Sequence, residues 1–84
     1  MYNIGMSPTI LKLRNIKLKI HTRDHKPAHI HAVSPDAEAK IDIQTGMVIE
    51  NFGFSKTSLN EIVAFIEKHR ALLIAQWKEI YEED

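Results

Sequence analysis

Alternating apolar and polar residues mark the first two thirds of the chain. They predict β-strands, because successive side chains of a strand point to opposite faces of a sheet. The phase of the alternation changes between Leu13 and Ile16, which indicates a bulge or bend near Asn15 within the first strand. The predicted strands cover residues 11–20, 28–34, 37–43 and 47–52.

Turn-forming residues separate these strands. Residues 22–27 are polar and end in Pro27, and residues 34–36 read Ser-Pro-Asp. Residues 44–46 form a short connection in which Gly46 is free to adopt a positive φ. Short connections of this kind join antiparallel neighbours, so the chain predicts an antiparallel sheet.

The spacing of apolar residues changes to a helical period after Gly53. Ser55 or Ser58 would cap the start of this helix, and Glu61 would complete a capping box with Ser58. Polar residues at 68–70 interrupt the apolar stripe, so we expect one kinked helix or two successive helices. The stripe consists of Leu59, Ile62, Val63, Ile66, Leu73, Trp77 and Ile80.

These elements predict a single small α+β domain, in which four antiparallel strands are followed by C-terminal helix packed on one face of the sheet. With 84 residues, of which 44% are hydrophobic and 26% charged, the chain is too short for two independent cores. We assign residues 10–84 to the domain and residues 1–9 to an N-terminal extension.

The amino-acid composition argues against several classes of function. Eleven basic residues balance eleven acidic ones, so no net charge draws the chain to nucleic acid or to anionic membranes. The absence of cysteine excludes disulfides, thiolate zinc sites and cysteine nucleophiles. We find no apolar run long enough for a membrane span and no signal peptide, so we expect a cytoplasmic protein.

Histidines are concentrated at one place in the chain, where His25, His29 and His31 fall within seven residues. Side chains two residues apart on a strand leave the same face, so His29 and His31 form a pair. If Ile20 pairs with Ile30, Lys19 lies opposite His31 and His21 lies opposite His29. The sheet face opposite the apolar one is then the candidate functional surface, and it carries Lys17, Lys19, His21, His29, His31, Glu38, Lys40 and Asp42.

Two motifs give the chain a resemblance to a known family. The first is Asp24-His25-x-Pro27-x-His29-Ile30-His31-Ala32, followed by Ala39-x-Ile41-Asp42-Ile43 and Gly46, and the second is His69-Arg70-x-x-Leu73 with Trp77. Together they resemble the bacterial domain of unknown function family 4160, with its D-H-x-P-P-H-F-H pattern. The resemblance implies no assigned chemistry. It implies a role as one component of a small two-gene, toxin–antitoxin-like module.

One hypothesis is a metal site. His29 and His31 would be two ligands, and His21, His25 or Asp24 would supply the third. Imidazoles in a tetrahedral arrangement favour zinc.

A second hypothesis is histidine-dependent RNA cleavage without a metal. His29 and His31, with His25 as a further candidate, would act as general base and acid, because histidine titrates near neutral pH. Lys17, Lys19 or Lys40 would stabilise the phosphate. The neutral net charge and the lack of an aromatic base-stacking platform on the polar sheet face weigh against this hypothesis.

The leading hypothesis is a protein-association module that pairs with a small partner protein. Its site would be the histidine-rich sheet face, with His21, Lys19, Lys40 and Asp42 as binding residues. Leu72 and Tyr81 lie off the apolar stripe and are candidate interface residues, whereas Trp77 continues the stripe and belongs to the core. The small size of the domain also leaves a homodimer open.

Overall fold

The structure, a computed structural model, describes residues 9–20 and 28–81. Within these residues one five-stranded sheet is followed by two helices, which confirms the predicted α+β class. The strands are β1 (Thr9–Leu13), β2 (Ile16–Lys19), β3 (His29–Ser34), β4 (Ala37–Asp42) and β5 (Val48–Phe52), and the helices are α1 (Lys56–Lys68) and α2 (Arg70–Tyr81).

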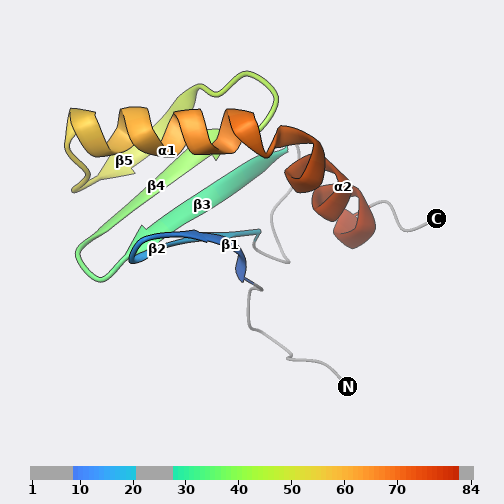
Figure 1. Cartoon of the computed structure of the whole chain (residues 1–84), viewed down its shortest axis with the longest axis horizontal. Coiled ribbons are helices and arrows are strands. Elements are labelled where there is room, and N and C mark those ends of the chain that lie inside the picture. Colours follow the sequence, from blue (N-terminus) through green and yellow to red (C-terminus); the bar gives the residue numbers. More distant parts are fainter. Residues whose placement is uncertain (1–8, 21–27, 82–84) are drawn as a thin grey trace.

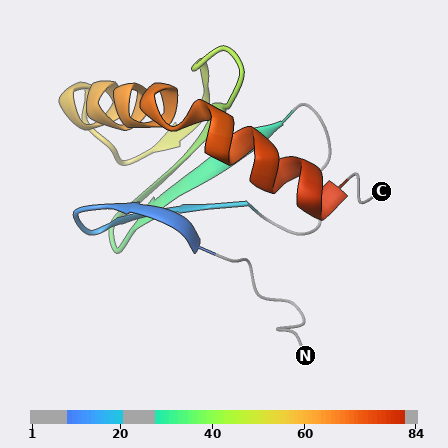
Figure 2. The same cartoon turned by 45° about the vertical axis from the view of Figure 1, so that its right-hand side comes forward.

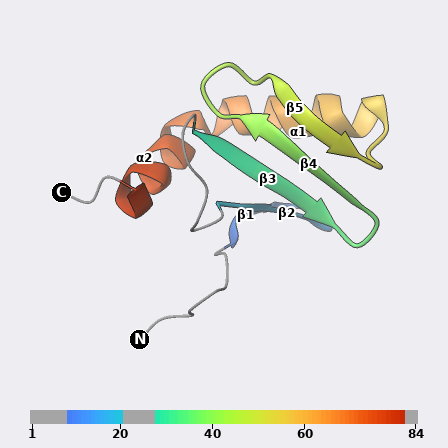
Figure 3. The same ribbon diagram turned by 180° about the vertical axis from the view of Figure 1, so that it is seen from behind.

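The sheet is an antiparallel meander in which each strand pairs with the next one along the chain (Figure 1). β3 lies at its centre, and β1 and β5 are its two edges. Seen from behind, the strands lie in front of α1, so α1 covers only one face of the sheet (Figure 3). α2 continues at an angle to α1, toward the end of the sheet where β2 finishes and β3 begins (Figure 2).

The first strand region is a hairpin rather than one bent strand. Leu13 pairs with Ile16, so Arg14 and Asn15 form a two-residue turn between β1 and β2. Arg14 has a φ of 57°, in the left-handed region that non-glycine residues rarely occupy. The predicted bend near Asn15 was therefore placed correctly, but it reverses the chain and adds a fifth strand.

The hairpin turn is tied to α1 by an ion pair. Arg14 Nη1 donates a hydrogen bond of 2.8 Å to Glu61 Oε1. The hydrogen bond and the charge of Arg14 lower the pKa of the Glu61 carboxyl from its ordinary value. The contribution of this pair to stability is therefore present at neutral pH and is lost as the pH falls through the lowered pKa.

The core lies between the sheet and the two helices. The alternation of β2, β3 and β4 places their buried apolar side chains on the helix-facing side. Trp77 belongs to the same core, as predicted. The buried core residues are Ile16, Leu18, Ile20, Ile30, Ala32, Ala39, Ile41, Ile43, Ile62, Ile66, Leu73 and Trp77.

The helical region divides at His69, as the interrupted stripe predicted. Ser55 caps α1, because its hydroxyl accepts a hydrogen bond of 3.1 Å from the backbone N–H of Ser58. Ser58 is therefore inside the helix, and the predicted Ser58–Glu61 capping box is wrong. His69 ends α1 and packs on Phe65, with 4.4 Å between ring centroids.

Truncation of a core isoleucine should be far more costly than truncation of an exposed one. Ile41 is fully buried and Ile49 is 43% exposed. We expect Ile41→Ala to lower the free energy of unfolding by about 2–5 kcal/mol. Ile49→Ala should lower it by less than about 1 kcal/mol. Urea denaturation of both variants measures the difference, and equal losses would contradict the position of the core.

Glycine should suit position 14 better than alanine does. Both Arg14→Gly and Arg14→Ala remove the ion pair to Glu61, so their difference isolates the backbone. Because φ is positive there, we expect the glycine variant to be more stable than the alanine variant by about 1 kcal/mol. Thermal denaturation of the two variants tests this, and a more stable alanine variant would contradict the turn geometry.

Candidate functional site

β3 carries both described histidines of the cluster on the sheet face away from Ile30. The predicted register is confirmed where it can be compared, because Leu18 lies opposite Ala32 and Lys19 lies opposite His31. We call this side of the sheet, which carries His29 and His31, the histidine face. His21 and His25 lie outside the described residues, so the predicted proximity of His21 to His29 stays a prediction.

Both imidazoles are buried, with only 6% of His29 and 8% of His31 exposed. They are therefore not freely exposed on the predicted functional surface. The ring of His29 lies 5.4 Å from the ring of Trp77, so α2 brings a large aromatic side chain to the beginning of β3. The period of a strand assigns a residue to a face, but it does not show what packs on that face.

His31 has a carboxylate beside it. Its Nδ1 lies 3.3 Å from Glu38 Oε2, on the neighbouring strand β4. Such a contact orients the imidazole ring. The sequence placed Glu38 on this face, but it did not connect Glu38 with His31, because the two are diagonal rather than opposite neighbours.

Of the other predicted binding residues, Lys19 and Lys40 lie beside His31, whereas Asp42 stabilises a turn. Lys19 and Lys40 flank His31 on the two neighbouring strands and are half-buried. Asp42 lies opposite His29, but its Oδ1 accepts hydrogen bonds of 2.8 and 3.0 Å from the backbone N–H groups of Gln44 and Thr45. Asp42 therefore shapes the turn before β5, an Asx-type role that its position in the sequence permits.

The two histidines are close enough to consider a shared metal ion, with 5.3 Å between ring centroids. Within residues 9–20 and 28–81, however, no group of three histidine or carboxylate side chains is arranged to hold a metal. Zinc sites use at least three protein ligands. The remaining candidates, His21, Asp24 and His25, lie outside the described residues, so the zinc site stays a prediction.

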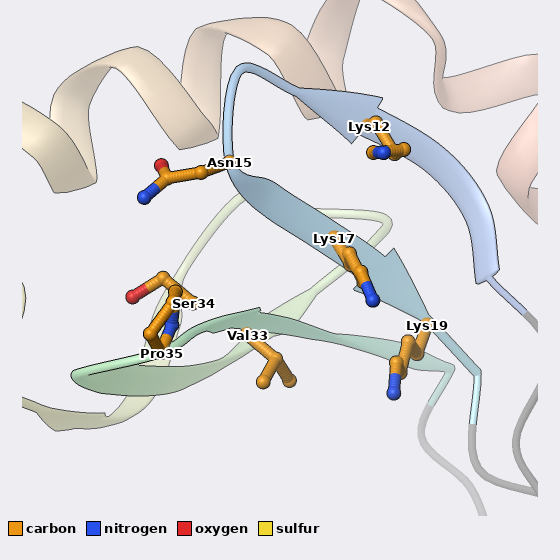
Figure 4. A pocket seen from close by; sticks show the side chains of 7 residues that line it. All are labelled: Lys12, Asn15, Lys17, Lys19, Val33, Ser34 and Pro35. Atoms are coloured by element: carbon orange, nitrogen blue, oxygen red, sulfur yellow. The ribbon is translucent and has the colours of Figure 1, made fainter.

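A lysine-rich pocket lies on the same sheet face, beside the histidines. It has a volume of about 430 Å³ and is lined by Lys12, Asn15, Lys17, Lys19, Val33, Ser34 and Pro35 (Figure 4). The sequence alone did not assign Lys12 to this face, because its position next to Lys17 depends on the hairpin between β1 and β2.

Comparison with protein families gives one match. The family model described as domain of unknown function, DUF4160, matches residues 15–78. The chain belongs to this family. The matched DUF4160 region contains His29, His31 and Trp77, so the buried histidines and the aromatic residue beside them all lie within the family's domain. No curated protein and no solved structure is detectably similar to the chain.

The described helices of this DUF4160 chain are too short or too polar to cross a membrane.

Removal of the His29 side chain should open the environment of Trp77. Trp77 is the single tryptophan of the chain, so its fluorescence reports on this site alone. We expect His29→Ala to shift the emission to longer wavelength, because water gains access to the indole ring, and to destabilise the domain by roughly 1–3 kcal/mol.

His69→Ala is the matched control, because His69 packs on Phe65 at the end of α1. Its emission maximum should equal that of the unsubstituted protein. An unchanged emission maximum in His29→Ala would contradict the packing of His29 on Trp77.

Proposed function

We propose that the protein is one component of a toxin–antitoxin-like pair and acts by association with a small partner protein, which adds a strand to β5. The pairing role is what the resemblance to the family implies. The choice of β5 rests on one observation: exposed apolar side chains gather along this open edge of the sheet.

Met47, Ile49 and Phe52 have exposed fractions of 66%, 43% and 68%. Among the described residues, Leu72 is the single other large hydrophobic residue with comparable exposure. Single exposed apolar residues are ordinary on protein surfaces, whereas a concentration of them is more informative. Three of the four exposed large hydrophobic residues of the described chain lie within residues 47–52, which favours β5 over α2 as the docking element.

An edge strand offers a row of backbone N–H and C=O groups to another strand. Within residues 9–20 and 28–81, β5 pairs with β4 on one side and has no strand on the other. Native edge strands are commonly protected by charged residues, proline or a bulge. β5, with the sequence VIENF, has one charged residue and a register shift against β4, but no lysine or proline. These features favour recognition by strand addition, in which the backbone supplies hydrogen bonds and side-chain contacts supply selectivity.

The charge on β5 defines the chemistry of the partner. Glu50 is exposed and lies opposite Lys40 on β4, but it forms no ion pair with Lys40 or with any other described residue. β5 contains no lysine or arginine, so pairing with β5 of a second copy would give Glu50 no cation to face. We therefore assign the edge to a different chain, whose strand carries apolar residues for Ile49 and Phe52 and a basic residue opposite Glu50.

The enzymatic alternative has less support. General acid–base catalysis requires the imidazoles to reach a substrate, and the imidazoles of His29 and His31 are both buried. Histidine-dependent RNA cleavage and zinc chemistry stay predictions from the sequence.

The chain offers a matched pair of variants for testing this proposal. Ile49 on β5 and Leu72 on α2 are exposed to 43% and 42%, respectively. A photo-crosslinking amino acid at either position, in the native host, identifies the partner, which is then purified and titrated against the protein. We expect Ile49→Lys to weaken binding by about tenfold or more, and Leu72→Lys by less than about twofold.

Three results would overturn the proposal. One is that no protein is captured at position 49. Another is that Leu72→Lys weakens binding as much as Ile49→Lys does, which would move the interface to α2. The third is that the purified protein is a homodimer that Ile49→Lys dissociates, because a second copy would then occupy the edge.

A further inference from the structure

The lysine-rich pocket has an unusual charge arrangement for a sheet surface. Lys12 and Lys17 lie directly opposite each other on β1 and β2, and Lys19 follows Lys17 on the same face of β2. Figure 4 shows Lys12, Lys17 and Lys19 following one another across β1 and β2, with Val33 on the neighbouring strand β3. Like charges directly opposite each other destabilise an antiparallel pair, so this arrangement costs free energy in the absence of a counter-ion.

None of the described carboxylates offsets these charges. The ion pairs of the described residues join Arg14 to Glu61, His31 to Glu38 and Arg70 to Glu67, and none involves a pocket lysine. The pocket lining contains no acidic residue either. A neutral protein that gathers three ammonium groups at one place creates a local positive potential despite its zero net charge.

We infer that this pocket binds two neighbouring phosphate groups. Lys17 lies between Lys12, across the hairpin, and Lys19, two residues along the strand, so two anions can each meet two ammonium groups. The remaining lining, Asn15, Val33, Ser34 and Pro35, is uncharged and contains no aromatic side chain on which a base could stack. Recognition is therefore of phosphates and not of bases.

The same chemistry occurs in a nucleotide diphosphate and in the backbone of single-stranded RNA. The volume of about 430 Å³ lies in the range of small-molecule sites, whereas the row of lysines along β2 suits a strand that continues past the pocket. Binding of both kinds of ligand is measured with the same lysine variants. The pocket is separate from the β5 edge, so the two proposals can fail independently.

Two triple variants provide the test and its control, because each replaces three lysines and so removes the same charge. The test variant is Lys12→Gln/Lys17→Gln/Lys19→Gln. The control variant is Lys56→Gln/Lys68→Gln/Lys78→Gln, which changes three exposed lysines of the helices. Binding of a fluorescein-labelled uridine 12-mer is followed by anisotropy as the salt concentration rises, and binding of pyrophosphate is followed by amide chemical shifts.

Two phosphate contacts to single-stranded RNA predict a slope of about −1.4 in a plot of log K against log salt concentration. This corresponds to a loss of affinity of roughly 7-fold between 50 and 200 mM salt. The pocket variant should lose the slope and the control variant should keep it. If RNA does not bind but pyrophosphate gives saturable shifts confined to the pocket lining, the ligand is a small diphosphate and the inference stands.

The inference is overturned if both triple variants weaken RNA binding equally, or if neither probe gives a saturable response at the pocket. Lys17→Glu separates loss of binding from loss of folding. It places a carboxylate opposite Lys12, so the variant should have a higher denaturation midpoint than the unsubstituted protein and yet bind neither probe. A lower midpoint would contradict the like-charge contact on which the site depends.

Discussion

Burial of the central strand β3 on both of its faces is the constraint on which the rest of the structure depends. Ile30 and Ala32 point to the core under the helices, while His29 and His31 point to the other face and are buried there as well. A strand covered on both sides has a defined register, because a slip by one residue would exchange isoleucine for histidine in the core. β2 and β4 pair directly with β3, and its apolar side chains join the same core as the residues of both helices.

Period-two and period-3.6 patterns were sufficient to predict most of this fold. Isoleucine and leucine on alternate positions identified the core face, and the polar interruption at residues 68–70 identified the break between α1 and α2. The hairpin at Arg14 could not be predicted, since arginine gives no signal for a positive φ. Burial of His29 was missed because Trp77 belongs to a distant helix, and a local pattern cannot show long-range packing.

The two proposed binding surfaces lie toward opposite edges of one sheet and differ in chemistry. The β1–β2 side presents lysines, and the β5 edge presents apolar side chains with a single carboxylate. Cross-strand pairing connects them through one row of residues, Lys12, Lys17, Val33, Glu38 and Phe52. The net charge of zero does not reveal this separation of charge, because the lysines come together only when the strands pair. A small domain can thus offer one edge to a protein and another region to an anion.

Hydrogen exchange of individual backbone amides, measured by NMR on the purified protein, tests the central claim most directly. A doubly buried β3 beside an open β5 predicts that amides of β3 exchange only through global unfolding, while the amides of β5 that face away from β4 exchange orders of magnitude faster. Protection of those outward β5 amides equal to that of β3 would mean that the edge is already covered, and it would contradict the account.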